Sequence, residues 1–185
     1  MRKLFTVVIF TIVVLLIGRS LTFLPRLTLF SNPKTEVLAL KKEINQLIQG
    51  QKGNFSVYFS DLNTDDLFFG INEHEVYIAA SVNKLAIVST LYYLAAKDKL
   101  DLNDRVTIQK DDIQDYGTGT IRYQKPGEVY SFKTLAKLSL QKSDNTAAHV
   151  LATEIGMEKV QKTIEAFGLT QTDMANNQTS LFDMY

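Results

Sequence analysis

The sequence contains no cysteine and no tryptophan, and only three prolines and two histidines among its 185 residues. Without cysteine, the chain can form no disulfide, no thiolate metal site and no lipidated cysteine. His74 and His149 are far apart in sequence and lack the spacing of a metal-binding pair. We therefore expect His74 in a solvated loop and His149 on an ordinary helix face, and the sequence predicts no metal and no cofactor.

Neither positive nor negative charge is in excess. The formal net charge is zero and no block of basic residues occurs, which argues against a nucleic-acid partner. Hydrophobic residues make up 45% of the chain, which is enough for a packed core. The length allows one domain and a short appendage.

The appendage is the N-terminal segment, residues 1–24. A basic start, Met1–Lys3, precedes the uncharged run Leu4–Ile17, as in a secretory signal or a membrane anchor. No Ala-x-Ala cleavage site follows, which favours an uncleaved anchor over a cleaved signal peptide. Basic residues before the run predict a domain on the extracytoplasmic face of the membrane, or secreted if the segment is cleaved. Residues 25–33 are expected to be a linker.

The remaining residues, 34–185, alternate between strand and helix patterns. Asn32 and Pro33 predict the start of a helix that Gly50 ends, and two strands are expected over 55–60 and 67–69. A central helix is expected to start with Ser81 in its first turn and to be buried on nearly every side. Further helices are expected over the ranges 132–140, 143–155 and 157–167.

The first candidate site is Ser81–Val82–Asn83–Lys84 at the start of the central helix. Residues three apart on a helix share a face, so Lys84 should lie beside Ser81. A buried amine loses its charge and can then take the proton of a neighbouring hydroxyl, which makes the serine a nucleophile. Taken alone, a serine at a helix start is most often only an N-cap.

A second motif, Ser143–Asp144–Asn145, opens the helix that runs to Ile155. All three residues are good helix caps, so capping is the simpler interpretation of this triplet alone. The order and spacing of the two motifs together are much more specific than either one.

With both motifs, the sequence resembles the penicillin-interacting serine hydrolases, and class A β-lactamases most closely, over residues 31–185. The resemblance includes Ala79–Lys84, Ser143–Ala148 and Thr179–Met184, which looks like the family's helix start after its omega loop. It implies an α/β fold, with an α+β sheet and a helical region. It also implies that Ser81 is the acylated nucleophile and Lys84 its proton acceptor, that Ser143 relays a proton, and that Asn145 binds the substrate amide and helps to position Lys84.

Two departures from the family stand out. No Lys-Thr-Gly strand occurs before Tyr185, so the closing strands and the C-terminal helix are missing, and a protein ending there is expected to be inactive. The family's omega-loop glutamate, which activates the deacylating water, is also missing between Gly168 and Thr179. Asp173 and Asn177 have the mutual spacing of the family's Glu-x-x-Leu-Asn motif, but the loop is short, and we interpret Asp173 as a connecting-loop residue.

Three functional hypotheses follow. The first is a serine hydrolase that hydrolyses β-lactams through an ester on Ser81. The second is a D-alanyl-D-alanine peptidase, similar to penicillin-binding proteins, with slow deacylation. The third is a non-catalytic cell-wall sensor that retains the fold. The missing glutamate favours acylation without fast release, and the missing strand favours the third hypothesis if Tyr185 is the natural end.

Overall fold

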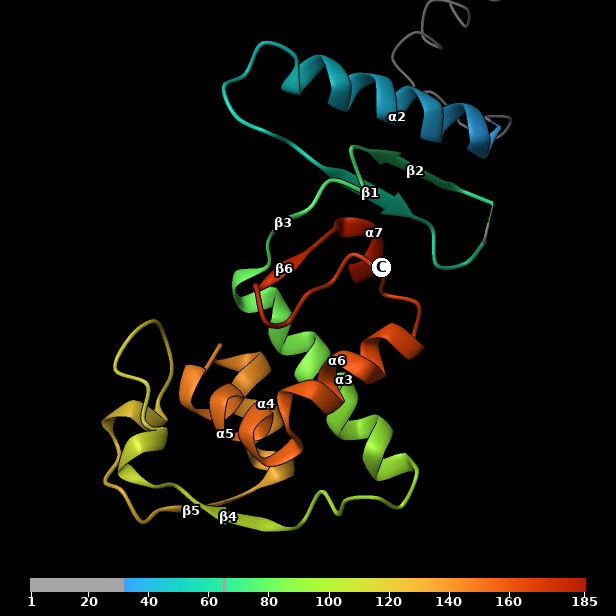
Figure 1. The fold of residues 1–185 in the computed structure, drawn as a ribbon. Coiled ribbons are helices and arrows are strands. Elements are labelled where there is room, and N and C mark those ends of the chain that lie inside the picture. The colour runs from blue at the N-terminus through green and yellow to red at the C-terminus, as the bar shows by residue number, and fades with distance from the viewer. Residues whose placement is uncertain (1–31, 65) are drawn as a thin grey trace, which may run out of the picture. The chain divides into compact units, whose positions relative to one another are not determined.

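The computed structural model describes residues 32–64 and 66–185 (Figure 1). The predicted N-terminal segment 1–24 and most of the linker 25–33 lie outside the described residues. Two compact units are distinguished: residues 32–51 with 60–64 and 66–69, and residues 52–59 with 70–185. Within the described ranges, no helix is both long and apolar enough to cross a membrane.

The first unit contains helix α2 (Pro33–Ile48), which begins as the sequence predicts. The side chain of Asn32 accepts a hydrogen bond from the Lys34 N–H at 3.0 Å, and Pro33 occupies the first helical position. Gly50 follows with a φ of +84°, a conformation that suits glycine at the end of a helix.

Three two-stranded sheets occur in the described chain. Strand β1 (Val57–Ser60) pairs with β2 (Phe68–Ile71), close to the two predicted strands. Strand β3 (Tyr77–Ile78) pairs antiparallel with β6 (Gln178–Thr179), and β4 (Arg105–Thr107) pairs antiparallel with β5 (Val129–Ser131). The last two sheets were not expected. The β3–β6 pair matters for the site because it holds residues 177–179 beside the segment that leads to Ser81.

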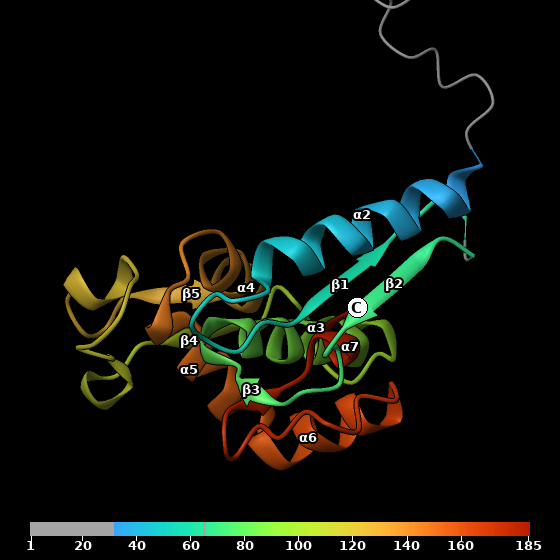
Figure 2. The same cartoon turned by 90° about the horizontal axis from the view of Figure 1, so that it is seen from above.

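The second unit contains the helical region and the main core. Helix α3 (Asn83–Ala96) contacts α4 (Phe132–Gln141), α5 (Asn145–Ile155) and α6 (Met157–Ala166), and Figures 1 and 2 show these three around it. Short 3₁₀ helices occur at Ala80–Val82 (η2), Lys110–Asp112 (η3) and Ile121–Tyr123 (η4). The fully buried side chains of this core are mainly aliphatic and include Leu91, Ile108, Ile121, Leu135, Leu151 and Ile164.

The structure corrects two details of the predicted central helix. The α-helix starts at Asn83, and Ser81 lies in the preceding 3₁₀ turn η2 rather than in the first α-helical turn. The helix is also not buried all round, because Leu85, Tyr92 and Tyr93 are 46%, 45% and 38% exposed. An apolar residue type does not by itself say which side of a helix the neighbouring elements cover.

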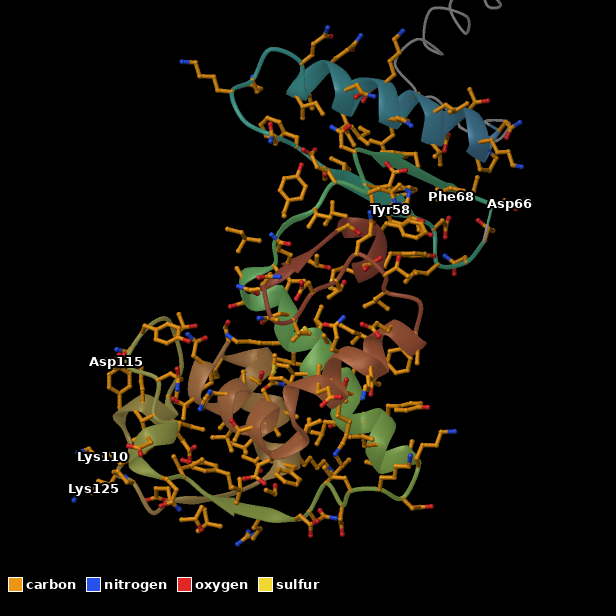
Figure 3. All side chains as sticks on the ribbon, in the orientation of Figure 1. Tyr58, Asp66, Phe68, Lys110, Asp115 and Lys125 are labelled. Carbon is orange, nitrogen blue, oxygen red and sulfur yellow. The ribbon has the colours of Figure 1, made fainter. Side chains whose placement is uncertain are left out.

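The C-terminal residues form α7 (Leu181–Met184), at the place where the sequence predicts a helix start. The ring of Tyr58 on β1, labelled in Figure 3, lies 6.2 Å from that of Phe182 and 4.8 Å from that of Tyr185. Asp183 is buried and accepts hydrogen bonds from the Gln171 N–H at 2.7 Å and the Thr172 hydroxyl at 2.8 Å. Through Asp183, helix α7 therefore holds Gln171 and Thr172, at the start of the loop that corresponds to the omega loop in the family resemblance.

Candidate active site

Two elements place the first pair of predicted residues. Ser81 lies in η2, and Lys84 follows in the first turn of α3. Ala80, just before the serine, has a φ of +48°, which is uncommon for a residue other than glycine and costs backbone energy. The Ala79 N–H donates to the Asn177 carbonyl at 2.7 Å, so the turn that carries Ser81 is tied to the end of the loop.

The amine of Lys84 lies at the centre of the site. The side chain is only 5% exposed, and its Nζ lies 3.1 Å from Ser81 Oγ and 2.7 Å from Asn145 Oδ1. It also lies 2.9 Å from the hydroxyl and 2.8 Å from the carbonyl oxygen of Ser143. Burial lowers the pKa of the Lys84 amine below its ordinary range, and the carboxylate of Asp144 acts in the opposite direction.

Ser143 completes a triangle with these two residues. Its hydroxyl donates to Ser81 Oγ at 2.9 Å. Ser143 has a φ of +50°, and its carbonyl oxygen accepts a hydrogen bond from the Thr118 hydroxyl at 2.9 Å. The hydroxyl oxygen of each serine therefore lies within hydrogen-bonding distance of the other hydroxyl and of the Lys84 amine. A proton can pass among these three groups.

Asp144 has a structural role between its two neighbours. It caps α5 by accepting from the Ala147 N–H at 3.0 Å, as the capping interpretation of the triplet predicts. Its other carboxylate oxygen accepts from the backbone N–H groups of Thr120 and Ile121, the latter at 2.9 Å. A Cβ at Gly119 would lie 2.5 Å from this carboxylate, so the loop approaches closely only because residue 119 has no side chain.

Asn145 begins α5 and faces the amine of Lys84. Its Nδ2 donates to the Tyr116 carbonyl at 3.1 Å, and its backbone N–H donates to the Thr118 carbonyl at 3.0 Å. Gly117, with a φ of +71°, packs so closely that a Cβ there would lie 2.2 Å from Nδ2. The structure thus brings together all four residues singled out from the sequence.

An open cavity of about 460 Å³ lies in front of these groups. It is lined by side chains from α3, α5 and α6 and from two loops: Ala80, Ser81, Asn83, Lys84, Ile87, Tyr116, Asn145, Ala148, His149, Ala152, Met157, Met174 and Asn177. Tyr116 and His149 are additions to the site that the sequence did not predict, although His149 does lie exposed on a face of α5, as expected. Its spacing of four residues from Asn145 places both on one face of α5, and this signal could have found it.

Asp173 does not line this cavity but a neighbouring one. Its carboxylate accepts hydrogen bonds within its own loop, from the Ala175 N–H at 2.8 Å and the Asn176 side chain at 2.7 Å. Hydrogen bonds from the backbone and side chain of Asn176 lower the pKa of the Asp173 carboxyl. Asn177 does line the Ser81 cavity, and its Oδ1 accepts from Asn83 Nδ2 at 2.8 Å.

No group of three or more His, Cys, Asp or Glu side chains that could hold a metal ion occurs within residues 32–64 and 66–185.

Comparisons with known proteins show which folds and sequences this chain is similar to. The structure of a mutant of PBP-A in an acyl-enzyme complex with penicillin G is 28% identical and has a TM-score of 0.71, covering 79% of this chain and 58% of its own. A β-lactamase from Francisella tularensis is 19% identical, with a TM-score of 0.67 and coverages of 78% and 59%, and shows the same fold.

Among curated proteins, β-lactamase BRO-1 of Moraxella catarrhalis is 30% identical over 83 residues, which are 45% of this chain and 26% of the relative. The chain therefore spans well under two thirds of the length of these relatives. Its fold is that of class A β-lactamases, as the sequence predicts. Because residues 39–184 match the model of the β-lactamase enzyme family over most of the chain, the protein belongs to that family.

Proposed function

We propose that this protein is a serine hydrolase that opens β-lactams by forming an ester on Ser81. The observation that carries the proposal is the triangle of Ser81, Lys84 and Ser143, whose three polar atoms lie 2.9 to 3.1 Å apart. A nucleophile and a base within hydrogen-bonding distance, with a third group that orients them, are what acyl transfer through a serine requires.

In the proposed acylation, the neutral amine of Lys84 takes the proton of Ser81 as Oγ attacks the lactam carbonyl carbon. The carbon–nitrogen bond of the lactam then breaks, and Ser143 passes a proton to the departing nitrogen. The backbone N–H of Ser81 supplies one donor of the oxyanion hole, as the family resemblance implies. Asn145 holds the amine of Lys84 in place and is available to the side-chain amide of the substrate.

A second candidate function, a D-alanyl-D-alanine peptidase with β-lactams as slow substrates, is favoured by the position of Asp173. Deacylation needs a base within hydrogen-bonding distance of the attacking water, or one water further away. The carboxylate of Asp173 is engaged by its own loop and lies outside the cavity lining. The relative solved as an acyl-enzyme with penicillin G is consistent with an ester that persists.

The test is to incubate the natural protein, together with any residues that follow Tyr185, with a chromogenic cephalosporin and to follow absorbance and intact mass together. We expect a burst of one acyl group per protein, followed by slow release. Ser81→Ala should abolish the adduct, whereas Ser89→Ala, which changes an exposed serine of the same helix, should not. Steady turnover without an adduct would favour β-lactam hydrolysis as the main activity. No adduct on the wild-type chain would contradict the proposal and favour a non-catalytic cell-wall sensor.

A further inference from the structure

We infer that His149 is a further catalytic residue of this site: its imidazole is the base for the water that hydrolyses the Ser81 ester. The inference rests on the proposed function, because it concerns the fate of that ester. It also accounts for how an ester could be released from a cavity that, among residues 32–64 and 66–185, is lined by no carboxylate.

The position of His149 follows from helix geometry. It lies one turn after Asn145 in α5, about 6 Å further along the helix axis at 1.5 Å per residue. Both side chains line the Ser81 cavity. Asn145 Oδ1 lies 2.7 Å from the Lys84 amine, so His149 lies one helical turn beyond a residue that contacts this amine, and it lines the same cavity as Ser81.

The other titratable groups in the cavity lining are poor candidates for this base. They are Lys84 and Tyr116. Lys84 is surrounded by acceptors from Ser81, Ser143 and Asn145, and in the proposed acylation it already handles the proton of Ser81. A phenol keeps its proton at neutral pH, and Tyr116 is 64% exposed. An imidazole is the side chain suited to accepting a proton between pH 5 and 8.

The imidazole is also free to act. Within the part of the chain that the structure describes, no hydrogen bond or ion pair engages His149, so both ring nitrogens are open to water. Its neighbours on this face, Ala148 and Ala152, are small, and the cavity of about 460 Å³ has room for an acyl group and a water. No carboxylate orients the ring, so we expect the step to be slow compared with that of a histidine held by a third group.

The charges around His149 come from few elements. Helix α3 contributes Lys84, and the segment before η4 contributes Tyr116. Helix α6 and the loop after it contribute Met157, Met174 and Asn177, none of which titrates near neutral pH. The carboxylate of Asp173 lines the neighbouring cavity instead. Among the described residues of this lining, Lys84 is therefore the one other basic side chain beside His149.

The proposed step balances as an ester hydrolysis. His149 takes one proton of the water while the water oxygen bonds to the ester carbonyl carbon, which gives a tetrahedral intermediate. The bond between that carbon and Ser81 Oγ then breaks, and Oγ receives a proton through Lys84 and Ser143. The products are the carboxylic acid and the free Ser81 hydroxyl, and His149 returns the proton to solvent or to the relay.

The test compares His149→Ala with Thr153→Ala, which changes an exposed residue one turn further along α5, outside the cavity lining. Each full-length protein is acylated with penicillin G, freed of excess ligand and followed by intact mass. The comparison starts from the ester that the wild type and the two variants have each formed. The His149→Ala ester should persist about 10²-fold longer, as expected on loss of a general base. Added imidazole should shorten its lifetime.

Loss of the His149→Ala ester at the wild-type rate would overturn the inference and leave the proposed function intact. A longer lifetime without rescue by imidazole would also overturn it, because the effect would then be structural. Failure of the wild-type chain to form an ester would instead overturn the proposed function, and this inference with it.

Discussion

At the scale of single residues, the site depends on the amine of Lys84, which is surrounded by more hydrogen-bond acceptors than it has hydrogens to donate. A lysine ammonium has three donor hydrogens, but four oxygens from Ser81, Ser143 and Asn145 surround the Nζ of Lys84. When the amine is neutral, its lone pair can be directed at one hydroxyl while its two hydrogens remain bonded to other oxygens. The arrangement therefore suits an amine that alternates between the two protonation states.

Substitution of Lys84 tests this role. Lys84→Ala should lower the rate of Ser81 acylation by about 10²- to 10⁴-fold, as is typical when a general base is removed. Labelling by a fluorescent penicillin, with the thermal transition measured in parallel, separates chemistry from folding. Lys137→Ala, which removes an exposed lysine of α4, is the matched control. Unchanged labelling of the Lys84→Ala protein would rule out Lys84 as the base.

The pH profile of acylation provides an independent check. The neutral amine is the active form and exists above the pKa of Lys84, so the rate should rise with pH. Because burial lowers that pKa, the rise should occur at a lower pH than the value of about 10.4 for an ordinary lysine. Stopped-flow acylation across this range measures the midpoint. A midpoint at the ordinary lysine value would contradict the role of burial.

Some of these site residues can be predicted from local sequence, and others only from the family resemblance. Helical spacing alone places Lys84 beside Ser81, and the 3.1 Å contact agrees, although the 3₁₀ turn was not foreseen. The proximity of Ser143 and Asn145 to the pair was expected only from the family resemblance, since local sequence says nothing about contacts across some 60 positions. His149 was missed because a lone histidine on a helix is more often a surface residue. Their catalytic roles remain predictions.

At the scale of elements, the start of α5 is positioned by the loop that precedes η4. Figure 3 labels Asp115 on this loop, which also carries Tyr116, and labels Lys110 in η3 before the loop and Lys125 after η4. Two glycines allow the loop backbone to approach, Gly117 against Asn145 and Gly119 against Asp144. The loop is therefore part of the catalytic geometry, although it has neither a strand nor an α-helix of its own.

Substitutions at two glycines distinguish the effect of the close contact between Gly117 and Asn145 from the effect of backbone strain. Gly117 and Gly127 both have positive φ, of +71° and +101°, but only a Cβ at residue 117 would clash, at 2.2 Å from Asn145 Nδ2. Both Gly117→Ala and Gly127→Ala should cost about 1 kcal/mol of stability or more. Only Gly117→Ala should also slow acylation, because it displaces Asn145 from Lys84. Thermal unfolding and penicillin labelling measure the two effects, and equal labelling of both variants would refute this explanation.

Long elements were easier to predict than short ones. Apolar periodicity and end signals located α2, α4, α5 and α6 to within a few residues. The β3–β6 and β4–β5 pairs have strands of only two or three residues, too short for alternation to be recognised. Their partners lie far away in sequence, so only the folded structure reveals them.

At the scale of the whole molecule, the sheets are small and some apolar surface is open. Strand β2 belongs to a two-stranded sheet in the described chain, and Phe68 on it is 57% exposed (Figure 3). An exposed aromatic side chain on a short sheet favours pairing with other molecules.

Solubility tests this interpretation. Phe68→Lys should raise the soluble fraction of the full chain on expression, because a lysine on an edge strand discourages strand pairing between molecules. Leu62→Lys is the control, since Leu62 is 88% exposed but lies in a turn rather than in a strand. The soluble fraction and sedimentation measure the outcome. An equal gain for both variants would show that general hydrophobicity, rather than the strand, limits solubility.

We propose that residues 1–24 hold the protein on the extracytoplasmic face of the membrane. The basic start followed by the uncharged run 4–17 motivates this, because positive residues before an apolar segment stay in the cytoplasm. Protease added to intact cells should remove the domain and leave a membrane-bound stub. The same chain without residues 1–24 should stay inside the cell and be protected. A full-length chain that resists the protease would contradict this topology. A soluble extracellular protein that begins near Ser20 would instead mean that the segment is a cleaved signal.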